Sequence, residues 1–224
     1  MADPEGSSVA WDLQYTGLTD AEMGAFEALF ESCEGRLRPF VFVDPLGNLL
    51  RWTEDLNKGV WQTGLLVVTA VEDPTGGTGA CRLTNGAQGV QRISQAVDAP
   101  TSYTYTFGVW AKSNSATSLR LGLDNGTSTI SVDVAVQGEW ECYSVSASGP
   151  DSGDSVRCFI EVPAATAVDV YGPQLDAQPD ASEYRKATDK SGVHMARFDQ
   201  DVLERRTFGP DNHSTRLRVV TVEE

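Results

Sequence analysis

The feature that most constrains the fold is a regular series of short apolar segments between residues 62 and 172, separated by Gly, Asn, Asp and Pro. In residues 103–110 (YTYTFGVW), aromatic or aliphatic side chains alternate with mostly small ones, as in a half-buried strand. Residues 124–127 carry the Asx-Gly signal of a tight β-hairpin. Short strands at this spacing predict an all-β sandwich rather than alternating strands and helices. The predicted strands are 62–72, 79–84, 89–97, 102–112, 117–123, 128–136, 139–147, 154–162 and 166–172.

The two ends of the chain have a different sequence pattern from this middle part. Thr19 and Glu22 form the pattern of a helix-capping box, and Gly35 stands where a helix would stop. Met23, Phe26, Phe30 and Cys33 recur between them at helical spacing, so an amphipathic helix is predicted over 20–34. Strands are predicted at 10–15, 39–43 and 193–199, with a hairpin of 202–207 and 215–222 around 208–212.

The N-terminal strand, helix and strand are too few to stand alone, so we expect the C-terminal strands to pair with them. The predicted fold is mostly β, with a jelly-roll-like sandwich at 47–187 inserted into a small α+β frame. The frame is formed by 1–46 and 188–224 and holds the one amphipathic helix. An insertion of this kind is tolerated because closing a longer loop costs little conformational entropy.

The charge balance bears on which partners the chain can bind. The chain has 32 acidic and 17 basic residues, a net charge of −15, which disfavours attraction to nucleic acid or anionic lipid. Either a well-solvated surface or a DNA-repelling wall of a conduit would carry such a charge. No apolar run approaches the ~20 residues of a membrane-spanning helix, and residues 1–5 lack the basic start of a signal peptide.

The metal-binding signals are weak. The four cysteines show no CxxC spacing and there are only two histidines, so no zinc site and no cofactor are expected. Cys142 and Cys158 fall in neighbouring predicted strands and could pair, but without an export signal free buried thiols are the prediction. Asp73, in the stretch 72–77, is a weak calcium candidate, and a turn capped by its carboxylate is the alternative.

The N-terminal region resembles a type of phage and prophage tail protein related to the distal-tail components of gene transfer agents. The similarity lies in residues 11–19 (WDLQYTGLT), 34–37 (EGRL) and 40–45 (FVFVDP). It implies assembly contacts through a frame that contains Trp11, Phe26, Phe30, Arg36, Phe40 and Phe42. Members of that family carry more sequence before the Trp11 region, so this chain is expected to be a shortened version.

The middle region resembles the carbohydrate-binding-module-like sandwiches of phage structural proteins. It opens with residues 48–56 (NLLRWTEDL) followed by Trp61, and it closes with 168–178 (VDVYGPQLDAQ) and 181–184 (ASEY). Residues 105–112 and 138–143 fit the internal strands of such modules. Lys112 stands at the usual basic position, whereas Glu141 and Cys142 depart from the common pattern.

A catalytic role finds little support. His194 and His213 have no nucleophile motif nearby and are predicted to be a strand residue and a turn residue. The acidic pairs Glu54–Asp55 and Glu72–Asp73 resemble the two carboxylates of a glycosidase, but pairs arise by chance among 32 acids. We therefore predict no catalytic residue and no enzyme.

A binding role has more support, because sugar-binding sandwiches stack aromatic rings on the C–H face of a sugar. Trp52 and Tyr103 are the predicted carbohydrate-binding residues, whereas Trp61 and Trp140 are predicted to lie in the core.

The predicted function is a virion structural protein of a phage-type tail, near the distal end or baseplate. It would act as a homo-oligomer, a trimer or hexamer, through contacts with other tail proteins, with a projecting sandwich that touches host-surface glycan. Its location would be the virion tail, after synthesis in the cytoplasm of the bacterial host. The alternatives are a stand-alone carbohydrate-binding protein and a glycan-degrading enzyme.

Overall fold

The computed structural model describes residues 9–149 and 153–222. These residues form two compact units. The frame unit contains residues 9–42 and 194–222, and the sandwich unit contains residues 43–193. The boundaries predicted for the sandwich were 47 and 187. The fold is mostly β with one helix, as predicted.

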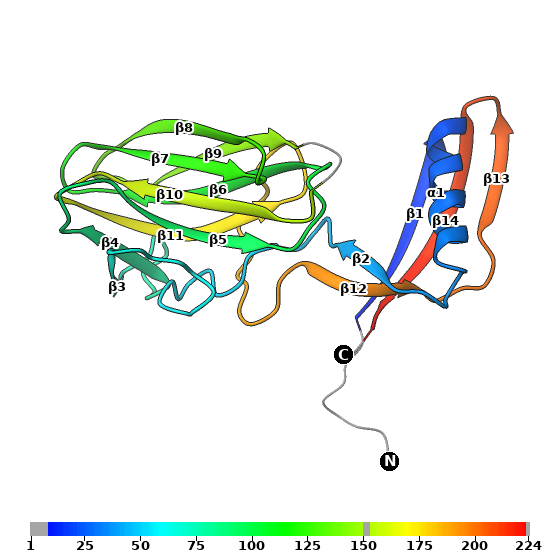
Figure 1. Cartoon of the computed structure of the whole chain (residues 1–224), viewed down its shortest axis with the longest axis horizontal. Coiled ribbons are helices and arrows are strands. Elements are labelled where there is room, and N and C mark those ends of the chain that lie inside the picture. Colours follow the sequence, from blue (N-terminus) through cyan, green and yellow to red (C-terminus); the bar gives the residue numbers. More distant parts are fainter. Residues whose placement is uncertain (1–8, 150–152, 223–224) are drawn as a thin grey trace, which may run out of the picture. The chain divides into compact units, whose positions relative to one another are not determined.

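The sandwich unit consists of two antiparallel sheets (Figure 1). The four-stranded sheet has the order β5-β10-β7-β8 and the five-stranded sheet has the order β3-β4-β11-β6-β9. The first sheet contains β5 (Gln91–Val97), β7 (Thr117–Asp124), β8 (Thr129–Val136) and β10 (Val156–Val162). The second contains β3 (Val67–Val71), β4 (Ala80–Asn85), β6 (Thr104–Lys112), β9 (Glu141–Ser148) and β11 (Thr166–Asp176).

Alternation along the strands builds the core between these sheets. In β6, Phe107, Val109 and Ala111 are buried, and in the neighbouring β11 Val168 and Val170 are buried. Side chains at the intervening positions point to the outer face of the five-stranded sheet, because successive residues of a strand face opposite sides. The predicted Asx-Gly turn joins β7 to β8, and Gly126 adopts the positive φ of 80° that such a turn requires.

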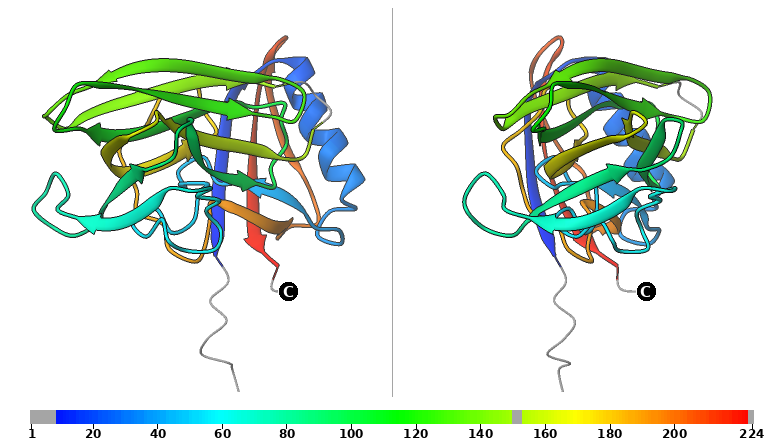
Figure 2. Two further views of the ribbon diagram at one scale, coloured as in Figure 1. Left: turned by 60° about the vertical axis from the view of Figure 1, so that its left-hand side comes forward. Right: turned by 90° about the vertical axis from the view of Figure 1, so that its left-hand side faces the viewer.

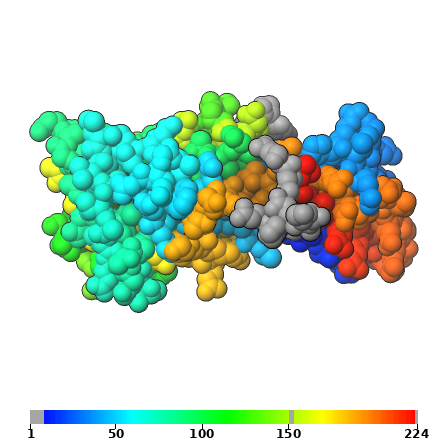
Figure 3. All heavy atoms as spheres, turned by 90° about the horizontal axis from the view of Figure 1, so that it is seen from below, coloured from blue at the N-terminus to red at the C-terminus, as the bar shows by residue number. Residues whose placement is uncertain are grey.

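The chain enters and leaves the sandwich at neighbouring positions. The amide of Asp44 donates to the carbonyl of Gly192 over 2.8 Å, and the amide of Gly192 donates to the carbonyl of Asn48 over 2.8 Å. Further along, the amide of Thr53 donates to the carbonyl of Ala187 over 3.0 Å. The segments that contain Thr53 (cyan) and Ala187 (orange) lie side by side on the surface in Figure 3. The entry and exit segments therefore close one end of the module together.

The frame unit is a five-stranded antiparallel sheet with one helix against it. Its sheet has the order β1-β14-β12-β2, with β13 also paired to β14. In both views of Figure 2, β1 (blue) and β14 (red) run side by side. The elements are β1 (Ala10–Leu18), α1 (Asp20–Ser32), β2 (Phe40–Val43), β12 (Val193–Phe198), β13 (Glu204–Gly209) and β14 (Asn212–Thr221). Within the described residues α1 is the sole helix, and it is not long and apolar enough to cross a membrane.

The predicted capping box starts α1. The Thr19 hydroxyl accepts from the amide of Glu22 over 3.2 Å, and the Glu22 carboxylate accepts from the amide of Thr19 over 2.8 Å. These bonds satisfy two amides that a helix start would otherwise leave without partners. They also lower the pKa of Glu22, so the cap stays ionised at neutral pH.

Aromatic side chains fill the core of the frame unit. Phe30 and Phe40 lie against Phe198, with ring centroids 5.0 and 4.8 Å apart, and Trp11 lies 4.7 Å from Phe42. Leu217 and Val219 of β14 complete this cluster. Two short terminal segments thus build a core that neither could build alone.

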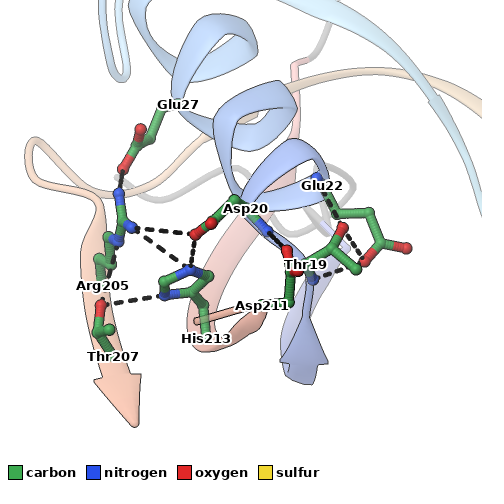
Figure 4. Close-up of polar contacts among 8 residues, drawn as sticks. All are labelled: Thr19, Asp20, Glu22, Glu27, Arg205, Thr207, Asp211 and His213. Atoms are coloured by element: carbon green, nitrogen blue, oxygen red, sulfur yellow. Dashed lines mark hydrogen bonds and ion pairs between the residues drawn. The ribbon is translucent and has the colours of Figure 1, made fainter. Parts of the chain in front are cut away.

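His213 corrects the sequence analysis, which placed it in a turn. It lies in β14 with 1% of its surface exposed. Figure 4 shows its imidazole between the start of α1 and β13, with hydrogen bonds to Asp20 (Nε2–Oδ1, 2.5 Å) and Thr207 (Nδ1–Oγ1, 3.0 Å). Arg205 joins the cluster through His213 Nε2 at 3.4 Å and Asp20 at 4.0 Å, and it also donates to Glu27 over 3.1 Å. The cluster ties the helix to the hairpin, which accounts for a buried histidine without a catalytic role. His194, predicted in a strand, is in β12.

The four cysteines are free thiols, as predicted. Cys142 lies in β9 and Cys158 in β10, which follow each other along the chain but belong to opposite sheets, and the alternative of a bond between them is not realised. Cys33, Cys81 and Cys158 are buried free thiols, whereas Cys142 is exposed. Burial raises the pKa of Cys158 to about 12, which keeps this thiol protonated and unreactive at neutral pH.

The adjacency of Asp44 and Gly192 makes the insertion testable. We expect a chain in which residues 45–191 are replaced by a short glycine linker to remain folded, because the frame unit keeps its own aromatic core. Circular dichroism during heating should show a cooperative transition, at a lower temperature than in the full chain because the remaining core is small. A remnant without a cooperative transition would contradict the insertion.

Candidate carbohydrate-binding surface

The outer face of the five-stranded sheet carries a group of aromatic side chains. Trp110 and Lys112 of β6 alternate with buried Val109 and Ala111, so both point outward. Trp110 is in register with Tyr171 of β11. All of these outward residues are half-buried.

Two more aromatic residues extend this group. The Trp140 ring lies 6.5 Å from the Tyr171 ring, and the Tyr171 ring lies 5.1 Å from the Tyr184 ring, both edge to face. Lys112 Nζ lies 4.7 Å from the centroid of Trp140. We call Trp110, Trp140, Tyr171 and Tyr184 the aromatic surface. Half-buried aromatic rings of this kind offer both stacking faces and polar handles to a ligand.

Tyr184 holds one end of the aromatic surface in place. Its hydroxyl shares hydrogen bonds with Thr53 at 2.9 Å and with Glu54 at 3.3 Å. Its ring lies on Gly172, which has a φ of 60°, and a Cβ there would stand 2.9 Å from the ring. Only glycine accommodates both the backbone angle and the ring. Burial raises the pKa of Tyr184, so its hydroxyl stays neutral.

A polar pocket of about 250 Å³ adjoins the aromatic surface. Its wall combines hydroxyl, amide and charged groups, which are the groups that order sugar hydroxyls. Asp169 connects the two features, because it lines the pocket and is also the register partner of Lys112. The lining residues that carry polar side chains are Arg82, Ser113, Asn114, Ser115, Thr117, Thr166 and Asp169.

The Arg82–Asp169 pair forms the edge between pocket and aromatic surface. Arg82 donates from Nε and Nη2 to the two carboxylate oxygens of Asp169, over 2.6 and 2.9 Å. Hydrogen bonding to Asp169 raises the pKa of Arg82, so the guanidinium stays charged. Asp169 is only 5% exposed, and the bidentate bond is what makes its buried charge tolerable.

The two predicted binding residues, Trp52 and Tyr103, have different surroundings in the structure. Trp52 is half-buried, with Lys58 Nζ 4.5 Å from its ring centroid and its carbonyl accepting from Trp61 Nε1 over 3.2 Å. Tyr103 is 50% exposed and lies edge to face with Tyr105 at 6.3 Å. Trp61 is buried, as predicted, but Trp140 is half-buried on the outer face and the core assignment was wrong for it.

Asp73 behaves as the turn cap that was the alternative to a calcium site. Its carboxylate accepts hydrogen bonds from the amides of Thr75, Gly77 and Gly79 and from the Thr75 hydroxyl, over 2.7 to 3.0 Å. These bonds, the Thr75 hydroxyl foremost, lower the pKa of Asp73. Across the described residues, no three His, Cys, Asp or Glu side chains gather as a metal site.

The predicted assembly residues of the frame mostly point inward. Trp11, Phe26, Phe30, Phe40 and Phe42 pack against the core of the frame unit. Arg36 lies on the surface and forms ion pairs with Asp199 at 3.7 Å and Asp201 at 3.1 Å.

The apolar side chains that the frame unit does expose are not the predicted assembly residues. Of the fifteen exposed large apolar or aromatic side chains among the described residues, eight are in this smaller unit: Val9, Leu29, Leu37, Val41, Met195, Val202, Phe208 and Val222.

The outer face of the four-stranded sheet carries a row of charged side chains instead of aromatic ones. Arg92, Glu161, Arg120 and Asp133 lie in one row across β5, β10, β7 and β8. Their alternating charges pair within the row, at 2.7, 3.8 and 2.8 Å. Because these charges already neutralise one another, the row stabilises the sheet and leaves little for a ligand.

Comparisons with known proteins extend only to fold. No family model matches the sequence, and no curated protein matches it. Among solved structures, the chain is similar to the enzymatically active domain of tailspike protein 4 of bacteriophage CBA120, with a TM-score of 0.49 and 14% identity. That match covers 58% of this chain and 21% of the tailspike chain, so the chain spans about a fifth of it.

Carbohydrate-binding modules are also similar in fold. TmCBM61, solved with beta-1,4-galactotriose, has a TM-score of 0.47 and 18% identity over 58% of this chain and 99% of its own. The C-terminal family 22 module of Clostridium thermocellum Xyn10B has a TM-score of 0.47 and 16% identity, over 60% and 98%. These likenesses are in fold alone and assign no ligand to this chain.

The Arg82–Asp169 pair should contribute more to stability than a comparable pair on the other sheet. Replacing Arg82 by Met leaves the buried carboxylate without its cation, and we expect a loss of about 1–3 kcal/mol in the free energy of unfolding. Arg120→Met is the matched control, because Arg120 makes the same bidentate bond to Asp133 but both side chains are exposed. Its expected loss is at most about 1 kcal/mol. Equal losses in urea unfolding would contradict this difference.

Proposed function

We propose that the sandwich unit binds glycan without cleaving it. The observation that carries this proposal is the aromatic surface, formed by Trp110, Trp140, Tyr171 and Tyr184 beside a polar pocket. Aromatic rings take the C–H face of a sugar, and the pocket offers hydroxyl, amide and charged groups for its hydroxyls.

We propose binding without cleavage because of the carboxyl groups that the pocket offers. Hydrolysis of a glycosidic bond needs one carboxyl group as acid and a second as base or nucleophile. The pocket contains the carboxylate of Asp169, and both of its oxygens accept hydrogen bonds from Arg82. This is one carboxylate where hydrolysis needs two, so binding is the better proposal.

We propose further that the chain is a structural component of a phage-type tail, near the distal end, in which the frame unit makes the assembly contacts. The sequence resemblance of residues 11–45 motivates this role. The concentration of exposed apolar side chains on the frame supports it, because such side chains often mark contact surfaces. A stand-alone carbohydrate-binding protein is the second candidate, favoured by the aromatic surface if no assembly is found.

Glycan binding is tested by removing one ring of the aromatic surface. Affinity electrophoresis through gels that contain soluble bacterial surface polysaccharides or plant xylan and galactan should retard the chain in at least one gel. We expect Trp140→Ala to weaken that binding about tenfold or more, as the loss of a stacking contact does. Tyr103→Ala is the control, since Tyr103 is an exposed aromatic residue of the same unit and should have no effect. The proposal fails if no gel retards the chain, or if both variants bind like the unchanged protein.

Assembly is tested by the native mass. Light scattering after size exclusion at high protein concentration should give a discrete trimer or hexamer, because closed rings form when one patch meets a different patch under rotation. Phe208→Ser, which removes the exposed ring from β13, should shift the mass toward the monomer. A monomer at every concentration would contradict self-assembly and favour the stand-alone candidate.

A further inference from the structure

We infer that the glycan bound at the aromatic surface is acidic and that Lys112 takes its carboxylate. This inference rests on the proposed glycan-binding function and adds the chemical class of the ligand. It starts from the position of Lys112, which points out of β6 with its ammonium 4.7 Å from the centroid of Trp140.

Within the part of the chain that the structure describes, Lys112 has no ion-pair partner. Its register neighbour is Asp169, but Arg82 already holds both carboxylate oxygens of Asp169. Over residues 9–149 and 153–222, no ion pair includes Lys112. By contrast, Lys58 is paired with Asp55 at 3.5 Å and Lys186 is paired with Glu54.

Arg82, Asp169 and Lys112 lie in one register row across β4, β11 and β6, and this row has one excess positive charge on a chain whose net charge is −15. Lys112 and Arg82 contribute two positive charges, and Asp169 contributes one negative charge. Arg82 has five N–H donors, of which those on Nε and Nη2 face Asp169, and its side chain is 40% exposed. One excess positive charge and unused guanidinium donors thus border the pocket.

These groups match the parts of a sugar acid. A ring that stacks on Trp140 would place a ring carboxylate within reach of the Lys112 ammonium that lies over the same indole. Its hydroxyl groups would face Ser113, Asn114 and Thr166 of the pocket. At about 250 Å³ the pocket is smaller than most sites for drug-sized ligands, so one sugar residue suits it better than a long chain.

The negative charge of the whole chain does not prevent this binding. At physiological ionic strength the Debye length is about 8 Å, so exposed charges beyond that distance are largely screened. A carboxylate near Trp140 would lie closest to Lys112, whereas the charges of Glu54, Asp73 and Lys186 act on Tyr171, the neighbouring ring of the aromatic surface.

The test compares acidic polysaccharides with their neutral counterparts. Polygalacturonate, alginate and hyaluronate are each used before and after chemical reduction of their carboxyl groups, in affinity electrophoresis with the full chain. We expect at least one acidic polymer to bind, and its reduced form to bind about tenfold more weakly. Dextran sulfate, a polyanion without carboxylates, should bind more weakly than that polymer.

Two lysine variants test whether Lys112 causes the preference for the acidic polymer. Lys112→Met should lose about tenfold in affinity for the acidic polymer and lose nothing for the reduced one. Lys58→Met is the matched control, because Lys58 also lies over an indole, that of Trp52 at 4.5 Å, and should bind both polymers like the unchanged chain.

The outcomes separate this inference from the proposed function. Equal binding of acidic and reduced polymers, with loss of both in Trp140→Ala, would overturn the acidic ligand and leave glycan binding standing. Unchanged affinity of Lys112→Met for the acidic polymer would overturn the role of Lys112. No binding to any polymer, together with no binding to the bacterial and plant glycans, would overturn both.

Discussion

The sandwich depends on the side-chain amide of Asn48, which joins three segments of the chain. Asn48 is 4% exposed, and its Nδ2 donates to the carbonyls of Pro173 and Arg185 over 3.2 and 3.0 Å. Its Oδ1 accepts from the amides of Leu50 and Leu175 over 3.0 and 3.2 Å. All four bonding positions of the amide are used, so no smaller or apolar side chain could replace it without leaving buried backbone groups unpaired.

This junction also determines which part of the five-stranded sheet stays open. The segment that follows β11 runs back over the outer face, where the Thr106 hydroxyl donates to the carbonyl of Gln178 and the Ser146 hydroxyl donates to that of Pro179. The covered half is thereby structural. The other half contains Trp110 and Lys112, which are half-buried, and Tyr184 of the return segment borders it through its contact with Tyr171.

Much of the fold follows from local sequence signals. The capping box at Thr19 and the Asx-Gly turn at 124–127 act over a few residues, and both have the predicted structures. Strand ends were less predictable. The 62–72 strand is only Val67–Val71, because Gln62 bridges to Ser94 and residues 63–66 form a turn. His213 was misplaced because its hydrogen-bond partner Asp20 lies far away in the sequence.

The sequence by itself determined that the chain is mostly β, where its helix begins, and which strand positions alternate, since these depend on neighbours within a few residues. Only the tertiary structure decided which aromatic residues share a surface. Trp110, Trp140 and Tyr171 come from three separate parts of the chain, and strand register brings them together. Alternation alone could have placed Trp110 and Lys112 on one face of their strand. It could not identify that face as the outer one, because the inner and outer faces are defined by the opposite sheet.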